Sequence, residues 1–141
     1  MYKRQVVNEN RIIESDIAIK NDRIEQVATS IDVESKEIID LDGKFVIPGL
    51  IDDQVHFRDP GLTHKGDILT ESKAAVAGGI TSYIEMPNTI PQTTSIDNLN
   101  RKFDIASEKS WANYSFMFGG TNDNFDAVSY THLTLPTKRI V

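Results

Sequence analysis

VIPGLIDDQVHFRDPG, residues 46–61, is the stretch of sequence that decides the fold. Pro48 and Gly49 are predicted to end one structural unit, because both residues punctuate regular structure. Residues 50–57 read as a strand, and Pro60-Gly61 breaks that strand. The sequence before this stretch has the pattern of short strands, and the sequence after it alternates between strand and helix. The chain is therefore predicted to change architecture at residues 48–49.

Residues 11–47 are predicted to form two β-hairpins. In the first, Ile17 and Ile19 alternate with polar neighbours, and Asn21-Asp22 supplies the turn before a return strand. In the second, Asp42-Gly43 separates the apolar residues of 38–41 from those of 45–47. This dipeptide suits a tight turn with positive φ, so a second hairpin is expected there.

Residues after Pro48 are predicted to form a β/α series. Gly78-Gly79 stops the first helix, and Thr94 or Ser95 can cap the second. The expected order is strand 50–57, helix 67–77, strand 80–86, a helix from the cap to about 109, and strand 114–118. The second helix has one apolar face, made of Ile96, Leu99, Phe103 and Ala106. Such a series predicts a parallel sheet covered by helices, joined by right-handed crossovers.

Composition narrows the function class. The net charge of −6 argues against a nucleic-acid surface or an anionic-membrane binder, which rely on clustered Lys and Arg. Cysteine is absent, so any metal must be held by His and carboxylates. No apolar run approaches the roughly 20 residues of a membrane span, and no secretory signal is recognisable at the start. We therefore expect a cytoplasmic protein that acts on a small molecule.

The two ends of the chain differ in charge from its body. Residues 1–5 (MYKRQ) and 129–141 (SYTHLTLPTKRIV) each carry two basic residues and no acid, while all 21 acids lie between them. Both segments resemble translated read-through of sequencing adapters. We expect both to be non-native and the gene to be cut at both ends. The alternative is a natural basic tail with a short strand around Leu133 and Leu135.

Polar residues occupy one side of the strand 50–57. Because side chains alternate along a strand, Gln54 and His56 share a face with Asp52. The other face carries Ile51, Val55 and Phe57. An unpaired buried polar group costs on the order of 1–3 kcal/mol, so the polar row needs a metal, a substrate or a hydrogen-bond network. From the residues alone, His56 is either a structural histidine or a metal ligand.

Arg58 and Asn88 follow the ends of two predicted strands. Arg58 either forms a surface ion pair with Asp59 or Asp67, or clamps a carboxylate with both guanidinium nitrogens. Pro60-Gly61 places it on a loop, where barrel enzymes keep their chemistry. Asn88, taken alone, is an ordinary turn residue after Pro87.

Four segments together resemble the opening of a dihydroorotase of the amidohydrolase superfamily. They are VIPGLIDDQVHFRDPG, THKGDI, AAVAGGITS and EMPNT, and the similarity covers residues 12–128. The resemblance implies an α/β fold in which a small β-sandwich flanks a TIM-type (β/α) barrel. Residues 6–48 would then be the N-terminal part of the sandwich, and residues 49–128 the first β/α units of a truncated barrel.

The resemblance also implies a function and a set of site residues. Dihydroorotases reversibly interconvert carbamoyl-aspartate and dihydroorotate in pyrimidine biosynthesis, with one or two Zn²⁺ ions. By this similarity, His56 corresponds to the second His of the family's His-x-His metal motif, and Arg58 and Asn88 would hold the carboxylate of a small anionic cyclic amide. The catalytic Asp and the remaining metal ligands come from later strands. No catalytic residue is therefore expected in this chain, which should have no turnover.

One departure from the family pattern stands at position 54. Gln54 occupies the place of the first His of the metal motif, and an amide oxygen is a poor zinc ligand beside imidazole. Three alternatives stay open. An allantoinase or hydantoinase would share the barrel and the motif of the first strand, and Gln54 supports most a non-catalytic paralogue that acts as a scaffold. The third is a free-standing β/α binding module. The parent protein is expected to bind neither nucleic acid nor membrane, and it could form homo-oligomers.

Overall fold

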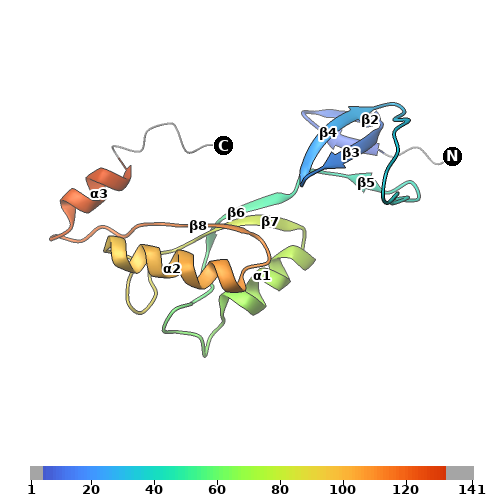
Figure 1. Cartoon of the computed structure of the whole chain (residues 1–141). Helices are drawn as coiled ribbons and strands as arrows, with labels where there is room; N and C mark the ends of the chain where they lie inside the picture. Colours follow the sequence, from blue (N-terminus) through green and yellow to red (C-terminus); the bar gives the residue numbers. More distant parts are fainter. Residues whose placement is uncertain (1–4, 133–141) are drawn as a thin grey trace. The chain divides into compact units, whose positions relative to one another are not determined.

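The computed structural model describes residues 5–132, and the chain divides into two compact units (Figure 1). The first is Met1–Pro48 and the second is Gly49–Val141. The division falls at the Pro48-Gly49 pair, where the sequence pattern predicts a change of architecture.

The first unit is built from short strands. β1 (Gln5–Asn8) pairs antiparallel with β2 (Arg11–Glu14) and parallel with β5 (Phe45–Val46). β3 (Asp16–Lys20) and β4 (Arg23–Ala28) form an antiparallel hairpin. Their turn residues Asn21 and Asp22 have φ values of 50° and 61°, the left-handed conformation of tight hairpin turns. The first predicted hairpin is therefore confirmed.

The second predicted hairpin is wrong. The turn itself forms, because Lys44 N–H donates to Leu41 C=O at 3.0 Å and Asp42 has a φ of 48°. Residues 38–41 nevertheless form no strand, and β5 pairs with β1 instead. A local hydrogen bond competes with strand pairing here. The Asp40 carboxylate accepts the Asp42 N–H at 3.0 Å and forms an Asx turn in place of a strand ladder.

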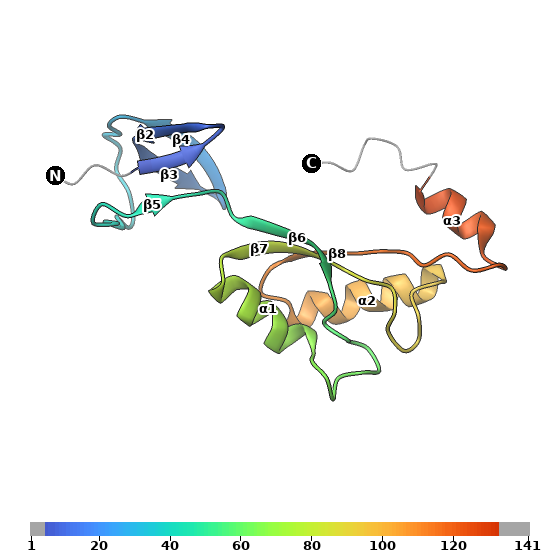
Figure 2. The ribbon, with the colours of Figure 1, turned by 180° about the vertical axis from the view of Figure 1, so that it is seen from behind.

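The second unit has the predicted β/α order. β6 (Leu50–Val55), β7 (Ile80–Glu85) and β8 (Asn113–Phe116) form a parallel sheet in the order β6-β7-β8. The helices α1 (Ile68–Ala77) and α2 (Ile96–Lys109) connect them and lie on the same side of the sheet (Figures 1 and 2). A further helix, α3 (Phe125–His132), follows β8.

The core of the second unit lies between the sheet and the two helices. It consists of Val55, Phe57, Ile68, Tyr83, Ala106, Ala112 and Phe116. The Phe57 and Tyr83 rings lie 4.5 Å apart, within the range of favourable aromatic pairs. Ile51, predicted on the same face as Val55 and Phe57, is instead 70% exposed.

β6 contains an irregularity before the candidate site. Asp52 pairs with Tyr83 and Val55 with Glu85, so β6 uses one residue more than β7 between these positions. A bulge interrupts the alternation of side chains. From Gln54 onward the alternation holds, because Gln54 and His56 are exposed while Val55 and Phe57 are buried. Alternation therefore does not place Asp52 in the row of Gln54 and His56.

Asp67 caps the N-terminus of α1. Its carboxylate accepts the Thr70 N–H at 2.8 Å, and this hydrogen bond lowers the pKa of Asp67 from its usual value of 3.8. Asp67→Ala is expected to lower the free energy of unfolding by about 1 kcal/mol, whereas Asp67→Asn, which keeps an acceptor, should lose much less. Urea unfolding followed by circular dichroism measures both.

The pH dependence of the cap has a definite sign. Because the folded-state pKa is lowered, the charge-dependent stabilisation is present above the unfolded-state pKa and disappears as the pH falls through the folded value. The difference between the wild-type chain and Asp67→Ala should therefore shrink in acid. An equal difference at neutral and strongly acidic pH would contradict this assignment.

Two observations concern the segments 1–5 and 129–141 that are predicted to be non-native. Gln5 lies in β1, and the predicted boundary between residues 128 and 129 falls within α3. Residues 1–4 and 133–141, including the strand considered around Leu133 and Leu135, lie outside the described residues. The foreign origin of both ends stays a prediction. Within residues 5–132, no helix has the length and apolar character needed to cross a membrane.

Candidate functional site

Two of the predicted site residues, His56 and Asn88, meet at the carboxyl ends of β6 and β7. His56 follows the last residue of β6, and Asn88 lies three residues beyond β7. His56 Nδ1 lies 3.1 Å from Asn88 Oδ1, a hydrogen bond between side chains 32 residues apart. With Nδ1 as the donor, a neutral imidazole keeps the Nε2 lone pair free. His56 is exposed, so this nitrogen is available to a metal ion or a proton donor.

Arg58 lies on the loop that follows β6, two residues after His56, in an unusual backbone conformation. Its φ is 70°, in the left-handed region, and its N–H donates to Glu85 Oε1 at 2.9 Å. Both carboxylates considered for a surface ion pair are engaged elsewhere. Asp59 Oδ2 lies 2.8 Å from Lys109 Nζ, and Asp67 caps α1. The geometry therefore gives no support to the surface-pair interpretation of Arg58.

Backbone contacts hold the two loops against each other. Met86 N–H donates to Val55 C=O at 3.0 Å, and Ile90 N–H donates to Pro60 C=O at 3.1 Å. Gly61 has a φ of 86°, and a Cβ at this position would clash with the Ile90 carbonyl. Only glycine fits so close an approach, which explains why glycine follows Pro60.

A buried ion pair lies beneath these loops, and the sequence interpretation missed it. Lys102 Nζ lies 3.0 Å from Glu85 Oε2, and each side chain is only 1% exposed. Burial raises the pKa of Glu85 and lowers that of Lys102, while the attraction between them opposes both shifts. Helical spacing carried a signal: Lys102 is three residues after Leu99 and four before Ala106, on the apolar face. Ile96 and Phe103 of that predicted face are each 39% exposed.

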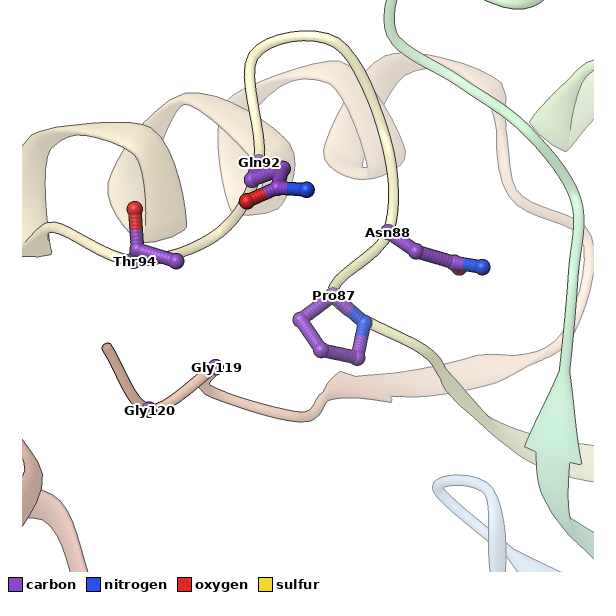
Figure 3. Close-up of a pocket in the computed structure, with 6 residues that line it drawn as sticks. All are labelled: Pro87, Asn88, Gln92, Thr94, Gly119 and Gly120. Atoms are coloured by element: carbon purple, nitrogen blue, oxygen red, sulfur yellow. The ribbon is translucent and has the colours of Figure 1, made fainter. Parts of the chain in front are cut away.

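A shallow pocket of about 140 Å³ borders the site. It is lined by Pro87, Asn88, Gln92, Thr94, Gly119 and Gly120 (Figure 3). The Asn88 side chain points away from Thr94 and Gly119 in this view. Asn88 thus takes part in both features, since it lines the pocket and its Oδ1 contacts His56.

The described residues do not complete a metal centre. Within residues 5–132, no three or more His, Cys, Asp or Glu side chains gather closely enough to hold a metal ion. Gln54 is exposed, and its backbone N–H donates to the Asp52 carboxylate at 3.1 Å. His56 is the one predicted ligand that the described part of the chain places at the site. These residues alone do not fit a complete zinc site.

The fold and the site together define the class of protein. Parallel β/α units with polar residues at the carboxyl ends of the strands are typical of α/β enzymes. Residues 43–111 match the family described as "Dihydro-orotase-like". Over these residues, just under half of the chain, the sequence is similar to the dihydroorotase-like proteins of the amidohydrolase superfamily.

Several curated and solved proteins are similar to this chain. The dihydroorotase of Pediococcus pentosaceus is 44% identical over 87 residues, which are 62% of this chain and 20% of that protein. The allantoinase of Desulfitobacterium hafniense is 40% identical over 122 residues, or 86% of this chain and 27% of that protein. The L-hydantoinase structure from Arthrobacter aurescens has a TM-score of 0.85 and 33% identity, covering 95% of this chain and 31% of that one. The chain thus spans between a fifth and a third of these relatives.

Proposed function

We propose that this chain is the substrate-anchoring part of a metal-dependent hydrolase of cyclic amides, with dihydroorotate as its substrate. The hydrogen bond between His56 and Asn88 carries the proposal, because it joins a candidate metal ligand to a candidate substrate contact. Both residues lie beside the loop of Arg58 at the edge where α/β barrel enzymes bind their substrates. The family match and the named relatives support the reaction class.

Each site residue has a distinct role in this proposal. The Arg58 guanidinium and the Asn88 amide would hold the substrate carboxylate, so that the ring is presented in one orientation. His56, with Nδ1 bonded to Asn88, would offer Nε2 to zinc, as one or two ions in the complete protein. We place this protein in the cytoplasm and expect its further ligands and catalytic Asp beyond the described residues.

The choice of substrate is open to a direct test. Dihydroorotate carries a ring carboxylate, whereas allantoin and hydantoin do not. If Arg58 and Asn88 are carboxylate anchors, the complete protein should prefer dihydroorotate over the other two by about 100-fold or more in kcat/KM. Steady-state assays of the three substrates under identical conditions measure this preference.

Two outcomes would contradict the preference. Faster turnover of hydantoin would favour a second candidate function, that of a hydantoinase. The structural similarity to L-hydantoinase supports this candidate. A protein that purifies without metal and hydrolyses none of the three would be a scaffold, the alternative that Gln54 favours. The 141-residue chain with added zinc serves as the negative control, since the described residues lack a complete metal centre.

A further inference from the structure

Two buried charges lie beneath the loops of the candidate site. Glu85 is the last residue of β7 and Lys102 belongs to α2, and both lie in the layer between sheet and helices. Removing two ions from water is costly, and apolar residues of similar size often fill such a space with no loss of stability. Stability alone is therefore a poor explanation for this pair.

Each member of the pair also holds one backbone group of a different loop. Glu85 Oε1 accepts the N–H of Arg58 at 2.9 Å. Lys102 Nζ donates to the C=O of Met86 at 3.1 Å, two residues before Asn88. The ion pair consequently links the segment that carries Arg58 to the segment that carries Asn88.

The backbone of Arg58 needs such a contact. A residue with a Cβ is strained at a φ of 70°, and strain of this kind persists only where the surroundings fix it. The carboxylate that accepts this N–H is itself fixed by Lys102. The ammonium of Lys102 also lies 4.9 Å from the centre of the Phe116 ring, which fixes its position against β8.

We propose that Glu85 and Lys102 are positioning residues that set the spacing of Arg58 and Asn88, and thereby the affinity of the site for a substrate carboxylate. This inference rests on the proposed function. Both side chains are shielded from solvent by the sheet and α2, so they act through the two loops without touching the substrate.

Three variants of the complete protein test the inference. Glu85→Leu combined with Lys102→Met replaces the pair by apolar side chains and removes both holds on the loops. Glu85→Gln combined with Lys102→Met removes both charges but keeps an oxygen for the Arg58 N–H. Arg101→Met removes a charge from an exposed position on the same helix and serves as the matched control. Three measurements are made on each variant and on the wild-type protein. They are thermal unfolding, steady-state kinetics with dihydroorotate, and deuterium uptake by residues 56–62.

The variants should separate positioning from structure. The Leu/Met variant should melt close to the wild-type protein, with a KM raised about tenfold or more, a kcat changed far less, and faster deuterium uptake at residues 56–62. The Gln/Met variant should recover most of the protection at residues 56–62, because the Arg58 N–H keeps its acceptor. It should recover only part of the KM, because the Met86 C=O still lacks its donor. The Arg101→Met variant should match the wild-type protein in all three measurements.

Several results would overturn the inference. A folded Leu/Met variant with unchanged KM and unchanged uptake would exclude the positioning role. Rapid uptake at residues 56–62 of the wild-type protein would exclude it as well, whether or not the variants fold. If the wild-type protein hydrolyses no cyclic amide, the proposed function fails, and uptake at residues 56–62 still decides whether the ion pair fixes the loop.

Discussion

Lys102→Met alone is expected to lower the free energy of unfolding by about 3–5 kcal/mol, because it leaves the Glu85 carboxylate buried without its counter-charge. Glu85 is 1% exposed, and its Oε2 lies 3.0 Å from the ammonium that the substitution removes. The Met86 C=O loses its donor at the same time. Urea unfolding of the wild-type chain and the variant, followed by circular dichroism, measures the difference.

The stability lost in Lys102→Met should depend on the pH and on the presence of the Glu85 carboxylate. Burial raises the pKa of Glu85, so the penalty on its ionised form is largest well above that pKa and fades as the carboxyl takes up a proton. The difference between wild type and variant should therefore shrink as the pH falls from neutral into the acidic range. Adding Glu85→Leu should restore most of the stability. If Lys102→Met alone were as stable as the variant that also carries Glu85→Leu, the two residues would not be coupled.

The β/α unit could be predicted from the sequence because its signals are local. Asp67 and Ser95 act as N-caps, accepting the N–H groups of Thr70 and Asn98. Gly78-Gly79 ends α1, with Gly79 at a φ of 88°. Caps and glycine stops act within a few residues, so they can be read directly from the order of residues.

Features that depend on distant parts of the chain were missed. The Asp42-Gly43 turn forms, but the partner of β5 is β1, about 40 residues earlier in the sequence. Residues 38–41 lack the expected ladder for this reason. Strand pairing is decided by tertiary contacts as well as by turn chemistry, so the dipeptide alone predicts the turn and not the pairing.

The candidate site shows the same division between local and tertiary signals. The order of strand, loop and polar residue places His56 and Asn88 at one edge of the sheet, where they form a hydrogen bond. Helical spacing places Lys102 on the apolar face of α2, and a fully buried charge needs a partner. No local signal identifies Glu85 as that partner, because the two residues belong to different elements. Only the packing of α2 on the sheet reveals that partner.

Exposed apolar side chains distinguish the first unit from a finished domain. Ile12, Ile19, Ile24, Ile38, Ile39 and Phe45 are each more than half exposed. So many exposed apolar side chains in one small unit leave its apolar surface available for burial against another part of a protein or a partner. This exposure agrees with the proposal that the chain belongs to a larger hydrolase.

Arg58→Gln in the complete protein is expected to raise the KM for dihydroorotate on the order of 100-fold, the second large effect that the structure predicts. The guanidinium can form two charge-assisted hydrogen bonds with a carboxylate, and glutamine can form neither with the same strength. The stability of the loop should change little, because the backbone N–H that Glu85 accepts is still present. Steady-state kinetics and thermal unfolding measure the two effects separately.

Two comparisons make this prediction specific to carboxylate binding. Arg101→Gln removes the same charge from an exposed position on α2, so it should leave the KM unchanged. Hydantoin has no carboxylate, and any turnover of it should be about equally fast in the wild-type protein and in Arg58→Gln, whereas turnover of dihydroorotate should fall sharply. An equal loss on both substrates would mean that Arg58 supports the loop or the chemistry in general. Its assignment as a carboxylate anchor would then have to be abandoned, while the contact between His56 and Asn88 would still mark the site.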